Sequence, residues 1–435
     1  MLARQHHSAR ELSFSVTNES KFRSFKTKPS FNPSTNPPTL GSDLDLRTQL
    51  EQWVRTKLNE RCSSDYHSDY VVTLMPLSGD AGFRQYYRSI AAESNPQAKK
   101  ATGTGGANGP ASNQSLCAAS QSFLAVYAPP QTEDSQRFAD LARLLRRNGV
   151  RAPQIIASDL EAGFLLLEDF GSVHLADRLQ NDASLYYGEA LLSLLRIQAI
   201  AIEAARELGI QDYSEAIAKR EFDLCADWFA SQWLGIDLSD AEHIVFHNAF
   251  SVLFEAFEAQ PQVLVHRDFH SRNLMIAADE SMGVIDFQDA LIGPAAYDLI
   301  SLTKDCYIKW PDDLVDSWNL GYAKLACASG LFPNELLFDS DADNEREKAR
   351  RWLDQCNFVA LQRHIKVLGI FARLAIRDGK TRYLNDLPRV FEYVMQALQR
   401  YHEREPALNS LYQFFASRLA PAFEKAMLAQ QSKQT

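Results

Sequence analysis

The sequence predicts an α+β protein in which a small antiparallel sheet is followed by a larger, mostly helical part. Five short apolar segments of the first half are expected to be strands: 70–77, 83–91, 122–127, 155–158 and 163–167. After Gly171, apolar residues recur at helical spacing almost throughout. The chain has 435 residues, enough for two or three domains that each bury a core of their own.

Two helices are expected among the strands. The first covers 44–58, where five apolar residues repeat at helical spacing: Leu46, Leu50, Trp53, Val54 and Leu58. The second covers 135–148 and ends before Gly149, with four apolar residues on one face: Phe138, Leu141, Leu144 and Leu145.

Two segments have compositions that oppose a packed core. Residues 1–43 are rich in Ser, Thr, Asn and Pro, and we expect a disordered tail or a start assigned too early. They lack the amphipathic period of an organelle transit peptide. The insert at about 93–120 contains ATGTGGANGPASNQ and is expected to be a flexible excursion from a hairpin tip. Its GTGG run lacks the Gly-Lys-Ser/Thr of a phosphate-binding loop.

The composition argues against several classes of partner. Hydrophobic residues make up 46% and charged residues 23%, as in ordinary soluble globular proteins. The formal net charge of -10 argues against a nucleic-acid partner. No apolar run approaches the roughly 18 to 20 residues of a spanning helix, so no membrane partner is expected. Six scattered cysteines without a CxxC pair favour reduced thiols in a cytoplasmic protein. No protein partner is indicated.

The segment 263–302 carries the clearest chemical signal. An HRD tripeptide ends in Asp268, Asn273 follows five residues later, and Asp286 stands at the end of a short apolar strand. Kinases use this order of residues to transfer the terminal phosphoryl group of a nucleotide. Asp268 would accept the proton of the attacking hydroxyl, while Asn273 and Asp286 would hold Mg²⁺ against the phosphates. The alternative is a buried polar turn between two strands.

Residues around the tripeptide are expected to support it. The apolar triplets 263–265 and 274–276 bracket the polar turn and are expected to form a buried pair of strands that holds it rigidly. His266 is expected to shape the loop by hydrogen bonds as a structural brace. His270 is expected to do the same, with a proton-transfer or substrate-binding role left open.

Two further aspartates follow the metal segment. Asp289 is a candidate second ligand or substrate contact, three residues beyond Asp286. Asp298 belongs to a Tyr-Asp-Leu sequence that is expected to begin a helix. Its carboxylate is expected to accept backbone hydrogens of the catalytic loop and so to act as a structural brace.

Five strands and a helical half form the two-lobed plan of a protein kinase-like fold. Residues 44–170 are expected to be a nucleotide-binding lobe, and 171–430 a catalytic and substrate-binding lobe, with ATP in the cleft between them. The connecting hinge would be Glu168, Asp169 and Phe170, whose backbone groups can pair with the adenine edge.

One feature departs from the kinase pattern. The third strand, within FLAVYAPP, has no Lys or Arg, although kinases usually place a Lys there to hold the α and β phosphates. Arg84 and Arg88 alternate on one face of the neighbouring strand and are candidates to bind the nucleotide instead. The alternative is a solvated strand face.

The motifs resemble a known family. HxDxxxxN followed by IDFxxAxxGPxxYDL is similar to the aminoglycoside and choline phosphotransferase family, whose kinase-like fold acts on small-molecule hydroxyls. Six blocks resemble the bacterial anomeric sugar kinases that phosphorylate N-acetylmuramate and N-acetylglucosamine in cell-wall recycling: 78–88, 128–134, 163–171, 285–302, 305–311 and 361–384. The resemblance covers about residues 45–400 and implies a sugar acceptor, ATP and Mg²⁺.

The implied acceptor suggests substrate-binding residues. N-acetylmuramate bears a lactyl carboxylate, which a forked guanidinium binds well. Arg363, Lys366 and Arg377 are therefore candidates, although basic residues on a helix are often only solvated. Asp305 and Trp310 are candidates to face the sugar, by hydrogen bonds and by stacking, and Trp310 equally suits the core.

Two alternatives stay open at this point. The acceptor could be an aminoglycoside, a choline-like amine or homoserine. A non-catalytic pseudokinase that binds nucleotide is the other, and the missing third-strand Lys is its only support.

Overall fold

The computed structural model describes residues 43–62, 70–77, 83–93 and 121–434. The predicted tail, the turn at 78–82 and most of the predicted insert lie outside these residues. The chain divides into two compact units, 1–46 and 47–435. The fold described below is that of the second unit.

The N-terminal lobe contains one antiparallel sheet with the strand order β1-β2-β3-β5-β4. The strands are β1 (Tyr70–Leu77), β2 (Gln85–Glu93), β3 (Gln121–Tyr127), β4 (Ile155–Asp159) and β5 (Phe164–Glu168). All five predicted strands are present, and the α+β prediction is confirmed. The second strand begins at Gln85, so Arg84 precedes the strand instead of lying within it.

Two helices belong to this lobe: α1 (Asp43–Cys62), from residue 47 onward, and α2 (Ser135–Arg147). The Asp134 side chain caps α2 by accepting a hydrogen bond from the backbone N–H of Arg137, at 2.9 Å. The apolar face of α2 is buried, as its spacing predicts, and Asn148 ends the helix.

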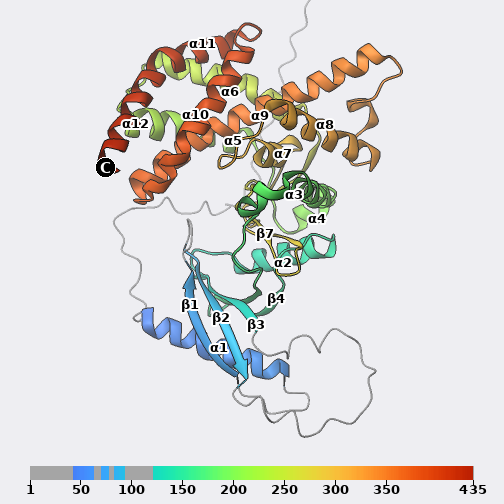
Figure 1. Ribbon diagram of the computed structural model, residues 1–435, viewed down its shortest axis with the longest axis vertical. Helices are drawn as coiled ribbons and strands as arrows, with labels where there is room; N and C mark the ends of the chain where they lie inside the picture. Colours follow the sequence, from blue (N-terminus) through green and yellow to red (C-terminus); the bar gives the residue numbers. More distant parts are fainter. Residues whose placement is uncertain (1–42, 63–69, 78–82, 94–120, 435) are drawn as a thin grey trace, which may run out of the picture. The chain divides into compact units, whose positions relative to one another are not determined.

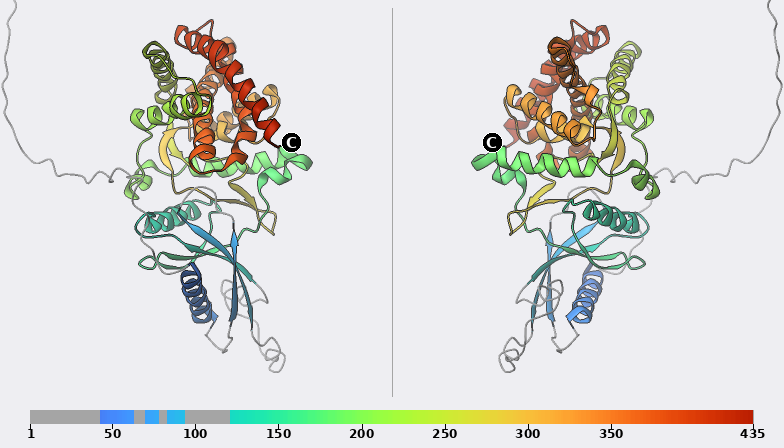
Figure 2. Two further views of the ribbon diagram at one scale, coloured as in Figure 1. Left: turned by 90° about the vertical axis from the view of Figure 1, so that its left-hand side faces the viewer. Right: turned by 90° about the vertical axis from the view of Figure 1, so that its right-hand side faces the viewer.

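The C-terminal lobe is mostly helical, as predicted. Its helical elements are α3 (Leu175–Gln198), α4 (Ile202–Glu207), α5 (Glu215–Leu224), the π-helix η3 (Cys225–Trp233), α6 (Asp240–Glu258), α7 (Ala296–Thr303), α8 (Asp312–Ala328), η4 (Asn334–Leu336), α9 (Ala342–Arg377), η5 (Thr381–Asp386), α10 (Leu387–Tyr401), α11 (Pro406–Phe414), η6 (Phe415–Leu419) and α12 (Ala420–Gln434). Figures 1 and 2 show α3 between the five-stranded sheet and the remaining C-terminal helices.

Helix α9 packs at very close range against the junction of α5 and η3. A Cβ atom added at Gly369 would lie 2.2 Å from the backbone carbon of Leu224, so only glycine permits this contact. Other helices cover the remaining sides of α9, including α6, α7 and α10. As a result, every residue from Val359 to Gly369 is buried. The polar side chains of this stretch of α9 must therefore find partners inside the lobe.

Two short antiparallel ribbons complete the C-terminal lobe. One pairs β6 (Gln262–Val265) with β9 (Leu291–Pro294), and the other pairs β7 (Leu274–Ile276) with β8 (Met282–Val284). The expectation that the two apolar triplets beside the polar turn pair with each other is wrong. Each triplet pairs with a later segment, because the intervening turn is braced by side chains instead of by a ladder between its own flanks.

Two findings bear on the predicted surroundings of the protein. Among the helices that the structure describes, none combines the length and the apolar character needed to cross a bilayer. Four cysteines in the described part are free and buried: Cys225, Cys306, Cys327 and Cys356.

Candidate active site

The loop after β6 begins with a strained turn that a buried carboxylate holds. Arg267 has a φ of 77°, a conformation that side-chain-bearing residues rarely adopt. The backbone N–H of His266 donates to Asp298 Oδ2 at 2.6 Å, and that of Arg267 donates to Oδ1 at 2.9 Å. Asp298 thus has the contacts expected of a brace. Its burial raises the pKa of this carboxyl to about 6.

A second buried carboxylate holds the far end of the loop. Asp305 accepts hydrogen bonds from the backbone N–H groups of Ser271, at 2.9 Å, and Tyr307, at 2.8 Å. Its side chain is completely buried. Since each oxygen serves a backbone donor, the contacts of Asp305 are those of a loop brace, and we do not assign it to the sugar.

His266 connects the loop to the metal segment. The backbone N–H of Asp268 donates to its Nδ1 at 3.3 Å, and its Nε2 lies 2.9 Å from the carbonyl oxygen of Ile285. Nε2 therefore carries the hydrogen and donates. Burial lowers the pKa of this imidazole, which favours the neutral form that the two contacts require.

The three residues of the predicted chemical signal lie together. The Asn273 amide donates to the backbone oxygen of Asp268 at 2.9 Å and to Asp286 Oδ2 at 3.2 Å. The Gln288 amide donates to Asp286 Oδ1 at 2.5 Å. Asp286 has a φ of 66°, a second strained residue in the site.

This donor set suits Mg²⁺. The described residues contain no group of three or more His, Cys, Asp or Glu side chains that could hold a metal ion. Mg²⁺ commonly needs only one or two protein oxygens, because phosphates and water complete its shell. Desolvation, and then the neighbouring Asp268 carboxylate, raise the pKa of Asp286, and a cation beside it would favour its ionised form. Asp289 is exposed beside this pair, and its backbone oxygen accepts from Arg267.

Cations surround the candidate base. Burial alone would raise the pKa of Asp268, but Lys366, His270 and Arg363 outweigh that effect and hold its pKa below the ordinary value. Arg363 and Lys366 are only 3% and 6% exposed, so the solvated helix face considered from the sequence is not what the fold provides.

Lys366 also takes part in a buried polar cluster. Its Nζ lies 2.9 Å from Glu221 Oε2 and donates to Tyr297 Oη at 3.0 Å. Glu221 pairs in addition with Arg267 of the HRD tripeptide and accepts from Tyr213. No local pattern marks Glu221, because its two cationic partners, Arg267 and Lys366, lie at least 46 residues away along the chain.

Three buried nitrogen atoms beside the base have no hydrogen-bond partner among the described residues: Nε of Arg267, Nε of Arg363 and Nδ1 of His270. Arg363 donates through Nη1 to Cys306 Sγ at 3.4 Å. Buried polar atoms are nearly always paired, so these three indicate a place for ligand oxygen atoms.

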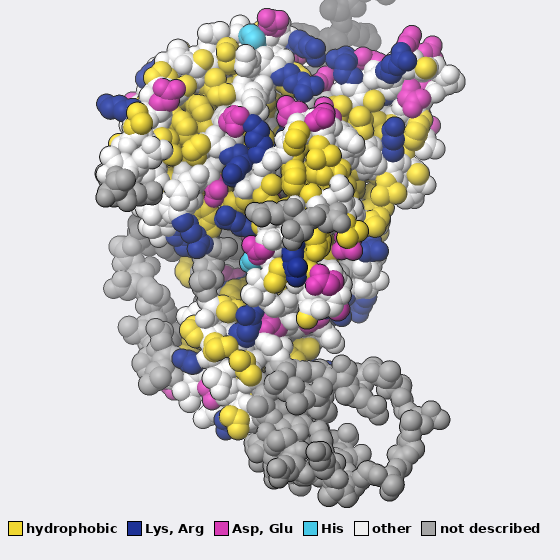
Figure 3. Space-filling view, viewed as in Figure 1, with side chains coloured by type: hydrophobic (Ala, Val, Ile, Leu, Met, Phe, Trp, Pro, Cys, Tyr) yellow, Lys and Arg dark blue, Asp and Glu magenta, His cyan; other side chains and the backbone are white. Residues whose placement is uncertain are grey.

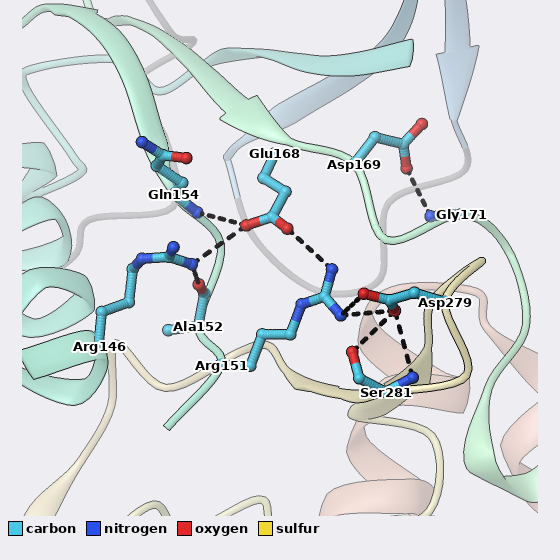
Figure 4. A network of polar contacts seen from close by, with 9 residues as sticks. All are labelled: Arg146, Arg151, Ala152, Gln154, Glu168, Asp169, Gly171, Asp279 and Ser281. Carbon is cyan, nitrogen blue, oxygen red and sulfur yellow. Dashed lines mark hydrogen bonds and ion pairs between the residues drawn. The ribbon is translucent and has the colours of Figure 1, made fainter. Parts of the chain in front are cut away.

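The side chains of the predicted hinge are occupied by protein partners. Figure 4 shows Glu168 between Arg146 and Arg151, each at 3.1 Å, with the Gln154 backbone N–H at 3.2 Å. Arg151 also reaches Asp279 of the β7–β8 turn at 2.7 Å. The carboxylate of Glu168 therefore contributes to the joint between the lobes.

Asp169 and Arg88 bind each other at 2.7 Å, and Arg88 also donates to the carbonyl oxygen of Gly171 at 2.8 Å. The ring of Phe170 packs on Gly283, where an added Cβ would lie 2.4 Å from it. Four of the predicted nucleotide-binding side chains, those of Arg88, Glu168, Asp169 and Phe170, are thus engaged within the protein.

Arg84 differs from Arg88 in its partner. It forms an ion pair with Glu133, just before α2, at 3.0 Å. Its guanidinium also lies over the ring of Phe138, 4.9 Å from the centroid. Sequence reasoning missed Glu133, although the APPQTED block contains it.

Two predicted substrate residues have other contacts. Arg377 is exposed at the end of α9 and pairs with its neighbour Asp378 at 2.7 Å. Trp310 donates its indole N–H to Tyr187 Oη at 2.7 Å and packs edge-on against Trp318. Neither residue has a described contact with the catalytic loop.

The molecular surface is mixed in character. On the face shown in Figure 3, basic and acidic side chains are interspersed, and hydrophobic side chains form patches on the helical part. One open apolar groove lies between α3 and α8, where Leu185, Leu192 and Leu325 are exposed. None of its lining residues belongs to the predicted site.

Comparisons with known proteins agree with this geometry. The model of the phosphotransferase enzyme family matches residues 73–335. The N-acetylmuramate/N-acetylglucosamine kinase of Pseudomonas putida is 33% identical over 381 residues, which cover 87% of this chain and 98% of that protein. The kinase of the same name from Pseudomonas aeruginosa is 35% identical over 345 residues, 79% of this chain and 88% of that one. An ethanolamine kinase structure from Plasmodium vivax is 12% identical, with a TM-score of 0.48, and covers 75% of this chain and 81% of that one.

The family match extends over more than half of the chain, and the relatives align along most of it. The predicted resemblance and the two-lobed kinase-like fold are therefore confirmed, and the protein is an enzyme that belongs to the phosphotransferase enzyme family.

Proposed function

We propose that this enzyme is an ATP- and Mg²⁺-dependent kinase for the anomeric hydroxyl of N-acetylmuramate or N-acetylglucosamine. The observation that carries the proposal is the convergence of Asp268, Asn273 and Asp286, with cations that keep Asp268 ionised. The names of the relatives that align along most of the chain point to the same two sugars.

The reaction requires one proton transfer and one displacement. The Asp268 carboxylate accepts the proton of the anomeric hydroxyl as the sugar oxygen forms its bond to the γ-phosphorus of ATP. The bond between that phosphorus and the β,γ-bridging oxygen breaks, and ADP leaves. An anomeric hydroxyl is more acidic than an ordinary alcohol, so a carboxylate with a lowered pKa is a sufficient base.

Asp286 and Asn273 would hold the metal ion, and Gln288 fixes the orientation of the Asp286 carboxylate. When bound, Mg²⁺ supplies positive charge that offsets the charge on the phosphate oxygens. Asn273 has a second role that needs no metal, since it ties the backbone of Asp268 to the Asp286 side chain.

The unpaired nitrogens near the base would bind the acceptor. Arg363 Nε suits the lactyl carboxylate of N-acetylmuramate, and His270 Nδ1 suits a hydroxyl or acetyl oxygen of either sugar. Three cations near Asp268 disfavour cationic acceptors such as aminoglycosides or choline: Arg267, Arg363 and Lys366.

The nucleotide would bind at the hinge through backbone groups. A small apolar cluster stands beside it, made of Phe170, Met275, Ala277 and the partly buried Ile285. Such a surface suits one face of a purine ring. Because ATP is a cytoplasmic nucleotide, we propose that the reaction takes place in the cytoplasm, in peptidoglycan recycling.

The test is ADP release by the purified protein with Mg²⁺ and ATP. We expect turnover with both N-acetylated sugars and none with their methyl glycosides, which lack a free anomeric hydroxyl. Choline, homoserine and a cationic aminoglycoside serve as competing acceptors. Turnover of the methyl glycosides would exclude anomeric phosphorylation, and preference for a cationic acceptor would exclude the sugar assignment.

A further inference from the structure

The nucleotide side of the site lacks an expected cation. Strand β3 reads QSFLAVY and carries no Lys or Arg. In protein kinases a Lys of the third strand contacts the α and β phosphates, and a helix Glu holds that Lys by an ion pair. Triphosphate binding here requires a positive charge from another position of the fold.

Arg84 satisfies the geometric requirements for that position. It lies next to the first residue of β2, and β2 pairs with β3 along its length. Its side chain is only 8% exposed, and its ion-pair partner Glu133 lies directly before α2. The arrangement joins a sheet cation to an acidic residue at a helix, as in the Lys–Glu pair.

The Arg84–Glu133 contact leaves capacity for a second anion. The contact joins Arg84 Nε to Glu133 Oε2 at 3.0 Å, so the ion pair engages one edge of the guanidinium. A guanidinium offers five N–H donors in a fork that matches phosphate oxygens. The pair can therefore anchor Arg84 while other donors face a ligand.

A continuous set of contacts connects Arg84 to the metal segment. Arg84 lies over the ring of Phe138, and that ring stacks on Phe287, with centroids 5.0 Å apart. Phe287 directly follows Asp286. Tyr86 lies within electrostatic reach of both groups: burial raises the pKa of its phenol, Arg84 opposes that rise and Asp286 adds to it. Arg84 is thus near the place where the phosphates would meet Mg²⁺.

Arg88 provides the contrast. Its guanidinium donates to both oxygens of Asp169 and to the carbonyl of Gly171, so three of its donor contacts lie within the protein. Arg84 differs in that its ion pair with Glu133 is made through Nε, so fewer of its donors are engaged by acceptors of the protein.

We propose that Arg84 contacts the nucleotide phosphates in place of the absent third-strand Lys, and that Glu133 is the positioning residue that holds Arg84 there. This inference rests on the nucleotide half of the proposed function and is independent of the sugar. It predicts that loss of Glu133 weakens nucleotide binding only because Arg84 is no longer held in place.

The test compares Arg84→Ala, Glu133→Gln and the double variant by titration of Mg²⁺-ADP into each protein, followed by kinetics. We expect about a 30-fold weaker Kd for Arg84→Ala, in line with truncation of a hydrogen-bonded charge. Glu133→Gln should weaken the Kd about fivefold. The double variant should match Arg84→Ala, because Glu133 has no effect once Arg84 is gone.

The matched control is Asp140→Asn. Asp140 forms an ion pair with Arg143 at 2.7 Å on the same helix, but both side chains are substantially exposed. Its Kd should stay within about twofold of the unmodified protein, since exposed pairs contribute little. KM for the acceptor sugar should also stay within about twofold in all variants.

Glu133→Asp provides a second variant, which keeps the charge but shortens the reach, and it should fall between Glu133→Gln and the unmodified protein. An unchanged Kd in Glu133→Gln, or equal losses in nucleotide and acceptor KM, would overturn the inference. Because ADP binding needs no acceptor, a wrong sugar assignment would leave this test intact.

Discussion

The acceptor side and the nucleotide side of this site use similar charged residues but differ in how completely those residues are paired. Beside Asp268, Arg363 and His270 each keep a buried nitrogen without a partner among the described residues. At the hinge, Glu168 and Asp169 are occupied by arginines. Because buried polar atoms are nearly always paired, this difference favours a ligand beside Asp268 over one that contacts the hinge side chains.

The largest expected effect comes from the base itself. Asp268→Asn should keep the fold and lower kcat by at least about 100-fold, because a positioned general base contributes about 10² to 10⁴. Steady-state kinetics, with circular dichroism as the folding control, would check this. Near-normal turnover in this variant would show that Asp268 is not the general base.

A smaller effect should separate the two sugars. Arg363→Met removes the proposed carboxylate partner, so KM for N-acetylmuramate should rise about 10- to 100-fold, the range for a hydrogen bond to a charged group. N-acetylglucosamine lacks the lactyl group and acts as the control within the same variant. Equal losses for both sugars would mean that Arg363 only supports the loop.

We expect the pH dependence of kcat to follow the ionisation of Asp298, the loop brace, instead of that of Asp268, the candidate base. The pKa of Asp298 is about 6, whereas that of Asp268 is lowered, so Asp298 is the first of the two to protonate as the pH falls. His266 and Asp268 face it. Only the ionised form keeps both oxygens as acceptors for the strained turn. We expect kcat to be about tenfold lower at pH 5 than at pH 7, as for one ionisation near 6.

The effect of pH on stability runs in the opposite direction to its effect on kcat. A raised pKa in the folded state means that this carboxyl adds most stability below its ordinary value, and that this stability is lost as the pH rises through about 6. Asp298→Asn should flatten both profiles between pH 5 and 7. Melting temperatures and kcat measured across that range would check this. If kcat still falls at low pH in the Asp298→Asn variant, the ionisation belongs to another group.

The smallest functional effect is expected on the paired side. Arg88→Met removes the cation that pairs with Asp169. Because the Asp169 side chain is almost fully buried, the free energy of unfolding should fall by about 1–3 kcal/mol. The Kd for Mg²⁺-ADP should stay within about twofold after correction for folded fraction. A loss as large as that of Arg84→Ala would remove the distinction drawn between Arg88 and Arg84.

The proximity of Asp268, Asn273 and Asp286 was predictable because its signal is local. Asp268 and Asn273 are five residues apart, and their strand context is visible in the sequence. The strand partners were not, since β6 and β7 each pair with segments further along the chain. The burial of Arg363 was also hidden, because it depends on helices that pack around α9 from every side. Glu221 and Glu133 gain meaning only through partners far away in sequence.

The close contact between the Phe170 ring and Gly283 has a consequence for motion between the two lobes. The ring rests directly on the strand that leads to Asp286, with no room for even a methyl group between them. A swing of one lobe against the other must therefore carry that strand along with it. Opening the cleft and displacing the Asp286 carboxylate would then be parts of a single movement.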